Sequence, residues 1–276
     1  MSKRTHKFAL LSMVLLSFPC LGAGKKPTEP TETCSTRECH NSYRQKRFVH
    51  EPVARGVCKL CHRLIDPKKH SFQLVRTRKE LCGGCHQEQA KGKYLHQPVE
   101  QGKCVDCHNP HASDYKFLVP TAKISELCRK CHDKKEDVKN PHAPVAEGKC
   151  TQCHSNHSSS YRPLLINNKR QLCFSCHSAD LVLVKENENL TEFRNGKTNL
   201  HYVHVNSPER GRTCRACHAT HASNEPKHLR KAIPYGGWEI PLQFEKTETG
   251  GGCSPGCHNA RAYDRMTPVV YMSDKK

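Results

Sequence analysis

The sequence predicts a mostly irregular chain with short α-helices and little or no β-structure, arranged as an array around a core that its amino acids do not supply. Leu, Ile, Val and Phe make up about 18% of the 276 residues, and the formal charge is +19, a composition that is typical of disordered chains. The chain nevertheless contains 19 cysteines. Their spacing repeats along the sequence, which indicates structural units that pack on one another.

The first 24 residues predict a secretory signal peptide. A positively charged start precedes an apolar run from Phe8 to Phe18, and Ala23 or Gly24 offers a small residue for cleavage. The run is too short to span a bilayer as a helix. Cys20 raises the alternative of a lipoprotein, but the residues before it are a poor lead-in to a lipidated cysteine. We therefore expect a cleaved, exported protein that is periplasmic or extracellular and does not span the membrane.

A repeat of 46 residues organises the middle of the chain. It separates Cys58, Cys104 and Cys150, and each unit contains two Cys-x-x-Cys-His motifs. The first motif of a unit follows a glycine, and the second follows a segment for which we expect a short helix. These features divide the chain into a signal peptide at 1–24, an N-terminal segment at 25–49, three tandem units at 50–184, an inserted polar loop at 185–200, a degenerate fourth unit at 201–232 and a C-terminal segment at 233–276.

Nine segments place a histidine directly after a pair of cysteines. The cysteine pairs are Cys34/Cys39, Cys58/Cys61, Cys82/Cys85, Cys104/Cys107, Cys128/Cys131, Cys150/Cys153, Cys173/Cys176, Cys214/Cys217 and Cys253/Cys257, and the histidines are His40, His62, His86, His108, His132, His154, His177, His218 and His258. Two thiols add to the vinyl groups of one porphyrin, and the adjacent histidine is then placed to bind its iron. The motifs therefore predict about nine covalent haem c groups.

Zinc is the main alternative for these cysteines. The two pairs within a unit are separated by about 20 residues, which is close to the spacing of a four-cysteine zinc ribbon. Neither zinc nor a disulfide framework requires a histidine after every second cysteine, however. Haem is therefore favoured, and the porphyrins supply the missing interior of a haem-cored array.

Histidines outside the motifs predict the second axial ligands, which we call distal ligands. The candidates are His50, His70, His96, His111, His142, His157, His204, His221 and His228, with His201 as the spare. Six of them recur at fixed offsets, eight residues before a motif or three residues after a motif histidine, and this repetition favours iron ligation over solvated surface histidines. Three residues are too few to reach the far side of the same haem. Histidines at that offset are therefore expected to serve a neighbouring haem.

Ligand type and charge support the same interpretation. Only Met266 and Met272 follow the predicted leader, so at most two haems can have a methionine ligand. Mostly bis-histidine ligation predicts low reduction potentials, which suit anaerobic respiration. The mature chain carries a formal charge of +16, and eighteen propionates would bring it to about −2. Dispersed Lys and Arg are therefore expected to pair with propionates rather than with nucleic acid.

The paired motifs of residues 50–177, and their degenerate copy around Cys214, resemble the doubled CXXCH family of multihaem cytochromes, whose members are known from metal-respiring and other anaerobic bacteria. The resemblance implies closely spaced haems in stacked and T-shaped pairs that form a chain along the molecule. The motifs at Cys34 and Cys253 depart from the standard spacing. Longer loops of this kind occur in other multihaem cytochromes, so both motifs are kept in the count.

We therefore predict an electron-transfer protein with no catalytic residues. Its expected partners are other redox proteins of the envelope: cytochromes, and quinol-oxidising or outer-membrane electron-transfer complexes. One alternative is a multihaem reductase of nitrite, hydroxylamine or a sulfur oxyanion. This enzyme needs an iron with an open axial position, against which the supply of histidines argues. Another alternative is a subunit of an extracellular cytochrome filament.

Overall fold

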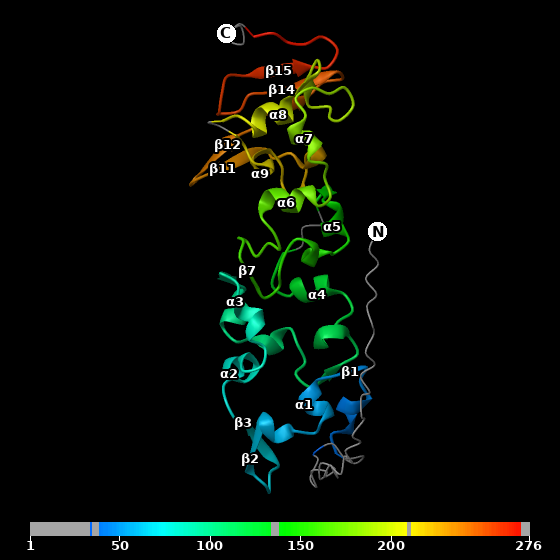
Figure 1. The fold of residues 1–276 in the computed structure, drawn as a ribbon, viewed down its shortest axis with the longest axis vertical. Coiled ribbons are helices and arrows are strands. Elements are labelled where there is room, and N and C mark those ends of the chain that lie inside the picture. The colour runs from blue at the N-terminus through cyan, green and yellow to red at the C-terminus, as the bar shows by residue number, and fades with distance from the viewer. Residues whose placement is uncertain (1–33, 35–38, 134–137, 209–210, 272–276) are drawn as a thin grey trace, which may run out of the picture.

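The computed structural model describes residue 34 and residues 39–133, 138–208 and 211–271. The predicted signal peptide, with Cys20, lies outside the described residues, as does Met272. The described chain forms an elongated molecule, and its units follow one another along the long axis in sequence order (Figure 1). No α-helix in these ranges is longer than six residues, and none has the length and apolar character needed to cross a bilayer.

Short helices form where the sequence predicts them. The α-helices are α1 (Glu51–Ala54), α2 (Arg78–Gly83), α3 (Gln97–Glu100), α4 (Ile124–Cys128), α5 (Ala143–Ala146), α6 (Lys169–Phe174), α7 (Asp180–Leu183), α8 (Leu200–Val205) and α9 (Cys214–Cys217). Helices α2, α4 and α6 lead into the second motif of each unit. The side chain of Thr77 caps α2 in a reciprocal capping box with Glu80, and Asn168 caps α6. Such caps satisfy amide groups that a short helix leaves free.

The first motif of each unit follows a helix that is stopped by glycine. Helices α1, α3 and α5 have proline as their second residue, where its missing N–H costs no helical hydrogen bond. Gly56, Gly102 and Gly148 follow them with φ of 70°, a conformation that strains other residues. In each unit, the backbone then enters a 3₁₀ turn that begins at the first cysteine of the motif. The 3₁₀ segments are η1 (Asn41–Gln45), η2 (Cys58–Leu60), η3 (Gln87–Ala90), η4 (Cys104–Asp106), η5 (Lys116–Leu118), η6 (Cys150–Gln152) and η7 (Pro226–His228).

Strands are short and lie in small antiparallel sheets. They are β1 (Phe48–Val49), β2 (His62–Asp66), β3 (Ser71–Leu74), β4 (Tyr94–Leu95), β5 (Ala112–Ser113), β6 (Asn140–Pro141), β7 (Ser158–Ser159), β8 (Arg194–Asn195), β9 (Thr198–Asn199), β10 (Ala222–Ser223), β11 (Ala232–Tyr235), β12 (Trp238–Pro241), β13 (Phe244–Lys246), β14 (Gly250–Cys253) and β15 (Arg261–Asp264). The pairs β1–β5, β4–β7 and β6–β10 each join the start of one unit to a segment of the following one. Consecutive units therefore interlock.

The polar stretch at 185–200 is more ordered than the exposed loop that its composition predicts. It ends in the hairpin β8–β9, and Asn199 is fully buried. The Asn199 amide donates to the carbonyls of Leu181 and Val184 at 3.0 and 2.8 Å, and its oxygen caps α8. A single side chain thus ties α7, β9 and α8 together, because a buried amide must satisfy all of its hydrogen-bonding groups.

The C-terminal segment forms the three-stranded sheet β13–β14–β15. Its central strand begins with three glycines, which permit close approach of the neighbouring strand. A Cβ atom on Gly250 would meet the Tyr263 carbonyl, and one on Gly251 would lie 2.7 Å from the Glu245 carbonyl. The ring of Tyr263 is buried beside this strand. The sequence analysis did not anticipate this sheet.

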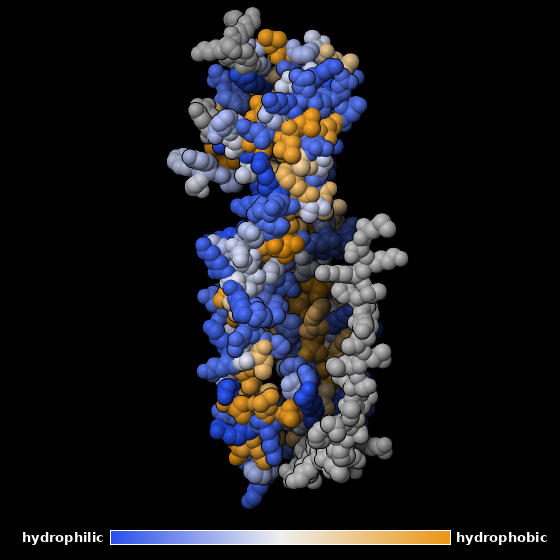
Figure 2. Space-filling view, viewed as in Figure 1, coloured by the Kyte–Doolittle hydropathy of each residue, from blue (hydrophilic) through white to orange (hydrophobic). Residues whose placement is uncertain are grey.

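Few side chains are buried anywhere in the described chain. The buried apolar residues there are Ala112, Val119, Leu165, Val182, Leu242 and Tyr263. Apolar residues instead appear in patches on a mostly hydrophilic face, some of them in a hollow along the middle of the molecule (Figure 2). The predicted fold class, a mostly irregular chain with short helices and no continuous protein core, is confirmed, and strand is confined to the small sheets above.

Candidate haem centres

One continuous cavity of about 4380 Å³ runs through the described molecule. Its walls include every motif histidine and, apart from Cys39, every motif cysteine. A pocket for one small ligand usually measures about 300–1,000 Å³, so this cavity can hold several large groups. None of the eighteen motif cysteines forms a disulfide bond. Among the described residues, no group of three or more metal-ligating side chains converges on a point, so the four-cysteine zinc site is not formed there.

Eight motif histidines face a second histidine across this cavity. Their ring centres lie 5.8–6.4 Å apart, and their ring planes are within 13–28° of parallel; the pairs are His40–His70, His62–His111, His86–His50, His108–His157, His132–His96, His154–His221, His177–His142 and His218–His201. An iron bonded to one nitrogen of each ring at about 2 Å would separate the ring centres by about 6 Å. The eight pairs therefore fit bis-histidine haem iron.

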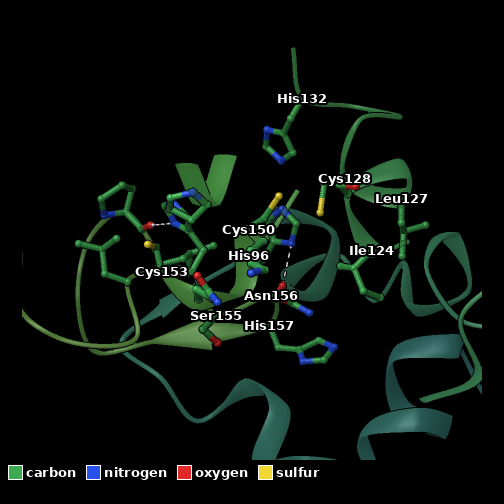
Figure 3. A pocket seen from close by; sticks show the side chains of 18 of the residues that line it. His96, Ile124, Leu127, Cys128, His132, Cys150, Cys153, Ser155, Asn156 and His157 are labelled. Atoms are coloured by element: carbon green, nitrogen blue, oxygen red, sulfur yellow. Dashed lines mark hydrogen bonds between the residues drawn. The ribbon is translucent and has the colours of Figure 1, made fainter. Parts of the chain in front are cut away.

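Figure 3 shows one of these sites. The rings of His96 and His132 point toward a shared space, and the sulfur atoms of Cys128 and Cys150 lie beside it. The Nδ1 atom of His96 hydrogen-bonds to the Asn156 carbonyl at 2.9 Å, drawn as a dashed line. This bond places the ring hydrogen on Nδ1 and leaves Nε2 free for a metal.

Backbone hydrogen bonds join candidate distal histidines from different units. The amide of His50 donates to the His111 carbonyl at 2.9 Å, and the amides of His96 and His142 donate to the carbonyls of His157 and His221 at 2.8 Å. In each case the two histidines face different motif histidines. The short strands that interlock the units thus also position these candidates, which explains their recurring offsets in the sequence.

Backbone carbonyls orient several motif histidines. The Nδ1 atoms of His108, His154 and His218 bond to the carbonyls of Phe117, Pro163 and Lys227 at 2.7, 3.0 and 2.9 Å. These carbonyls belong to loops that contain residues with positive φ. Sequence reasoning missed these contacts because a backbone carbonyl leaves no signal in the side-chain pattern.

Thiols from successive motifs lie near one another in sequence order. First cysteines lie close together in the pairs Cys34–Cys58, Cys82–Cys104, Cys128–Cys150 and Cys173–Cys214, and the second cysteine of one motif lies within electrostatic range of the next motif in the pairs Cys61–Cys85, Cys107–Cys131, Cys153–Cys176 and Cys217–Cys253. Burial raises the pKa of the Cys82 thiol to about 11, and Cys104 adds to this shift. The two kinds of pair alternate along the chain, and all nine motifs line the same cavity.

Burial also keeps distal imidazoles neutral. It lowers the pKa of His201 to about 4, with smaller effects from His218 and His204, and it lowers the pKa of His111, His142 and His157. A neutral imidazole is the form that binds a metal. One nitrogen atom in each of Arg194, Arg215 and Arg265 is buried without a hydrogen-bond partner. Such unpaired N–H groups fit the propionate carboxylates that haem would bring.

The structure places most of the predicted distal candidates in these pairs. His70 faces His40 from the turn after β2. His201, which the sequence analysis set aside as the spare, faces His218 at 6.4 Å. The sequence feature that could have identified His201 as a candidate is its spacing of three residues from His204, which puts both histidines on one face of α8. His204 and His228 face no motif histidine in the ring pairs of the described chain. His228 instead lies edge-on to His142, with a ring separation of 5.4 Å.

Comparison with known families agrees with this geometry. Residues 50–91, 96–137 and 142–181 each match the model of the doubled CXXCH motif. No curated protein matches the chain as a whole. The matched segments contain six of the motif histidines that face a second histidine, together with strands β5 and β7. The matched motif is the one that attaches haem c through two thiols. Residues 50–181 thus carry three copies of the doubled CXXCH motif, and the chain is a multihaem c-type cytochrome.

Proposed function

We propose that the protein transfers electrons along a row of about nine covalent haems, mostly with two histidine ligands, in the bacterial envelope or outside the cell. The observation that carries this proposal is the set of eight facing histidine pairs along one continuous cavity, which residues of all nine motifs line. When bound, haem iron exchanges single electrons between its ferric and ferrous states. A row without a gap is what electron hopping requires.

The side chains and backbone of this chain hold each site in one geometry. Carbonyls that accept from Nδ1 fix the tautomer and orientation of the ring and raise the basicity of the ligand. A more basic pair of imidazoles favours the ferric state, so we expect low potentials. Apolar cavity walls such as Val119 and Leu165, which are 6% and 8% exposed, exclude water from the row. Exclusion of water reduces the reorganisation that accompanies each change of charge.

Both ends of the row are suited to exchange with other proteins. The contacts run from the Cys34 motif at one end to the Cys253 motif at the other, so the ends are far apart in the elongated molecule (Figure 1). We propose that other redox proteins of the envelope meet these ends: cytochromes, and quinol-oxidising or outer-membrane complexes. Low-potential donors of this kind serve anaerobic respiration. Small, transient interfaces are typical of such electron-transfer encounters.

The intact mass of the purified holoprotein tests the number of haems. The expected value is that of the chain without its leader plus nine haems, and the same measurement locates the cleavage site. A mass with seven haems would mean that the two irregular motifs, at Cys34 and Cys253, are empty. A colourless chain that is still compactly folded would overturn the proposal.

Electron paramagnetic resonance of the oxidised holoprotein separates electron transfer from catalysis. Electron transfer predicts low-spin ferric signals throughout, because every iron then has two strong ligands. A multihaem reductase would show a high-spin signal that changes when nitrite, hydroxylamine or sulfite is added. Electron microscopy of the same sample would show filaments if the protein is instead a filament subunit.

A further inference from the structure

The eight facing pairs leave three histidines to be explained in the described chain. His258 is the last motif histidine, and its Nδ1 bonds to the Asn259 carbonyl at 2.6 Å. His204 and His228 are the two histidines outside the motifs that face no motif histidine in these pairs. The distal ligand of the His258 haem can therefore be sought in two places. The two differ in their surroundings.

His228 occupies a position that leucine holds in two other units. The amides of Asn109, Ser155 and Ala219, each directly after a motif histidine, donate to the carbonyls of Leu118, Leu164 and His228 at 2.7, 2.7 and 2.8 Å. The φ angles of the three acceptor residues are 56°, 53° and 57°. The three loops have the same construction, and only the third has an imidazole in place of an isobutyl group. His228 is thus in a packing position.

The ring of His228 also lacks the contact that orients a ligand. Its Nδ1 atom is buried and has no hydrogen-bond partner. Its nearest aromatic neighbour is His142, which it meets at an angle of 69°. His142 itself faces His177, so this contact leads to a haem that already has two histidines.

His204 has the contact that His228 lacks. It lies in the last turn of α8, and its Nδ1 atom donates to the Leu200 carbonyl at 2.7 Å. The bond leaves Nε2 free, as the corresponding bonds of His50 and His96 do. His201, one turn earlier on α8, already faces His218. Neighbouring ligands on one element would thus serve neighbouring haems, as the ladder-paired histidines do.

The surroundings of His204 belong to the last motif. Its ring lies 5.5 Å from the ring of Phe193, which lies 5.2 Å from the buried ring of Tyr263. Tyr263 packs beside β14, the strand that ends at Cys253. The cavity that His204 lines is also lined by Tyr263, Cys253 and Cys257. These ring contacts lead from His204 to the haem site at Cys253 and Cys257.

We propose that His204 is the distal ligand of the haem attached at Cys253 and Cys257, opposite His258, and that His228 packs against the haems without binding iron. This inference rests on the proposed function, since it requires haem at the last motif. It implies that the row ends in a six-coordinate centre. An electron-transfer end of this kind leaves no open iron for a substrate.

Two variants of the holoprotein test the assignment. His204→Ala should keep the full haem mass and convert one low-spin ferric haem per molecule to high-spin in electron paramagnetic resonance, and added imidazole should restore the low-spin signal. His228→Leu, which introduces the residue found in the other units, should leave every haem low-spin. If His204→Ala folds poorly, His204→Met should instead retain a sixth ligand and raise the potential of one haem.

The outcomes distinguish the ligand from the function. High-spin signal in His228→Leu but not in His204→Ala would assign the ligand to His228 and overturn the inference alone. A high-spin haem in the unmodified holoprotein would show an open site, and would overturn both the inference and the absence of a catalytic iron. An intact mass that lacks haem at Cys253 and Cys257 would overturn the proposed haem count together with the inference.

Discussion

The repeated part of the molecule, residues 50–181, and the C-terminal part, residues 182–271, are stabilised in different ways. In the repeats, the hairpin β2–β3, ladders of two residues and short helices surround the cavity, and the buried apolar side chains are Ala112, Val119 and Leu165. In the C-terminal part, Asn199 is fully buried, Leu242 and Tyr263 are 7% and 8% exposed, and three strands form a sheet. The repeats therefore depend on haem for an interior, and the C-terminal part builds some of its own.

The largest expected effect is the loss of the repeats when haem attachment is prevented. In a chain produced without a haem-attachment system, we expect residues 50–181 to lose their protection against hydrogen exchange, because they cannot bury enough apolar surface alone. Residual protection should be limited to α7, α8 and β13–β15. Hydrogen exchange read by mass spectrometry, with the holoprotein as reference, measures both parts in one sample. Equal protection of the repeats with and without haem would contradict the comparison.

The next largest effect is expected from a glycine in the repeats. A Cβ atom at Gly102, where φ is 70°, would lie 2.5 Å from the Lys79 Cβ atom. Gly102→Ala should lower the free energy of unfolding by about 3 kcal/mol, from backbone strain and overpacking together. The control is Gly236→Ala in the β11–β12 turn, where φ is 58° and no atom lies within 4 Å of the new Cβ. There we expect about 1 kcal/mol.

Denaturant unfolding of the two holoproteins, followed by haem absorbance, provides the measurement. Equal losses in the free energy of unfolding for Gly102→Ala and Gly236→Ala would mean that the contact between units at Gly102 adds nothing to the cost of backbone strain. The interlocked arrangement of the repeats would then lose its support.

The buried amide of Asn199 in the C-terminal part should contribute more to the free energy of unfolding than the helix cap at Asn168 in the repeats. Asn199→Ala removes two donors to buried carbonyls and the cap of α8, so we expect a loss of about 2–4 kcal/mol. Asn168→Ala removes the cap of α6, in which the Asn168 side-chain oxygen accepts from the Gln171 amide at 3.0 Å. This change should lower the free energy of unfolding by about 1 kcal/mol. Thermal unfolding of both variants against the unmodified holoprotein compares the two losses. The reverse order would show that the C-terminal part has no independent core.

The sequence predicted the parts of this molecule that chemistry requires to be local. A haem motif occupies five to seven consecutive residues, and a short helix with a cap such as Thr77 is encoded within a few more. The fold class and the helices before the second motifs were therefore predictable. The family resemblance follows from the same repeated spacing.

The pairing of distal histidines was not predictable, because it depends on strands that meet across units. His111 reaches His62 only because β5 pairs with β1. His201 was treated as the spare histidine, and its position in the fold depends on Asn199, which caps α8 from a stretch that composition predicts to be an exposed loop. The glycine-rich sheet was not predicted for a similar reason, because the close approach of strand β15 to Gly250 exists only in the folded structure.

The smallest expected effect is a pH-dependent one at the edge of the C-terminal sheet. Hydrogen bonds from the Thr249 hydroxyl, and from the amides of Thr267 and Met266, hold the pKa of Asp264 below its usual value of 3.8. A carboxyl with a lowered folded pKa stabilises the protein above its unfolded pKa, and this contribution is lost as the pH falls through the folded value. Asp264→Asn should therefore lower the thermal midpoint slightly at neutral pH, and the difference should shrink as the pH falls below 3.8. Thermal midpoints of the two holoproteins across this range test the prediction. A difference that stays constant with pH would show that the Asp264 turn is held by geometry rather than by charge, as the glycine turns of the repeats are.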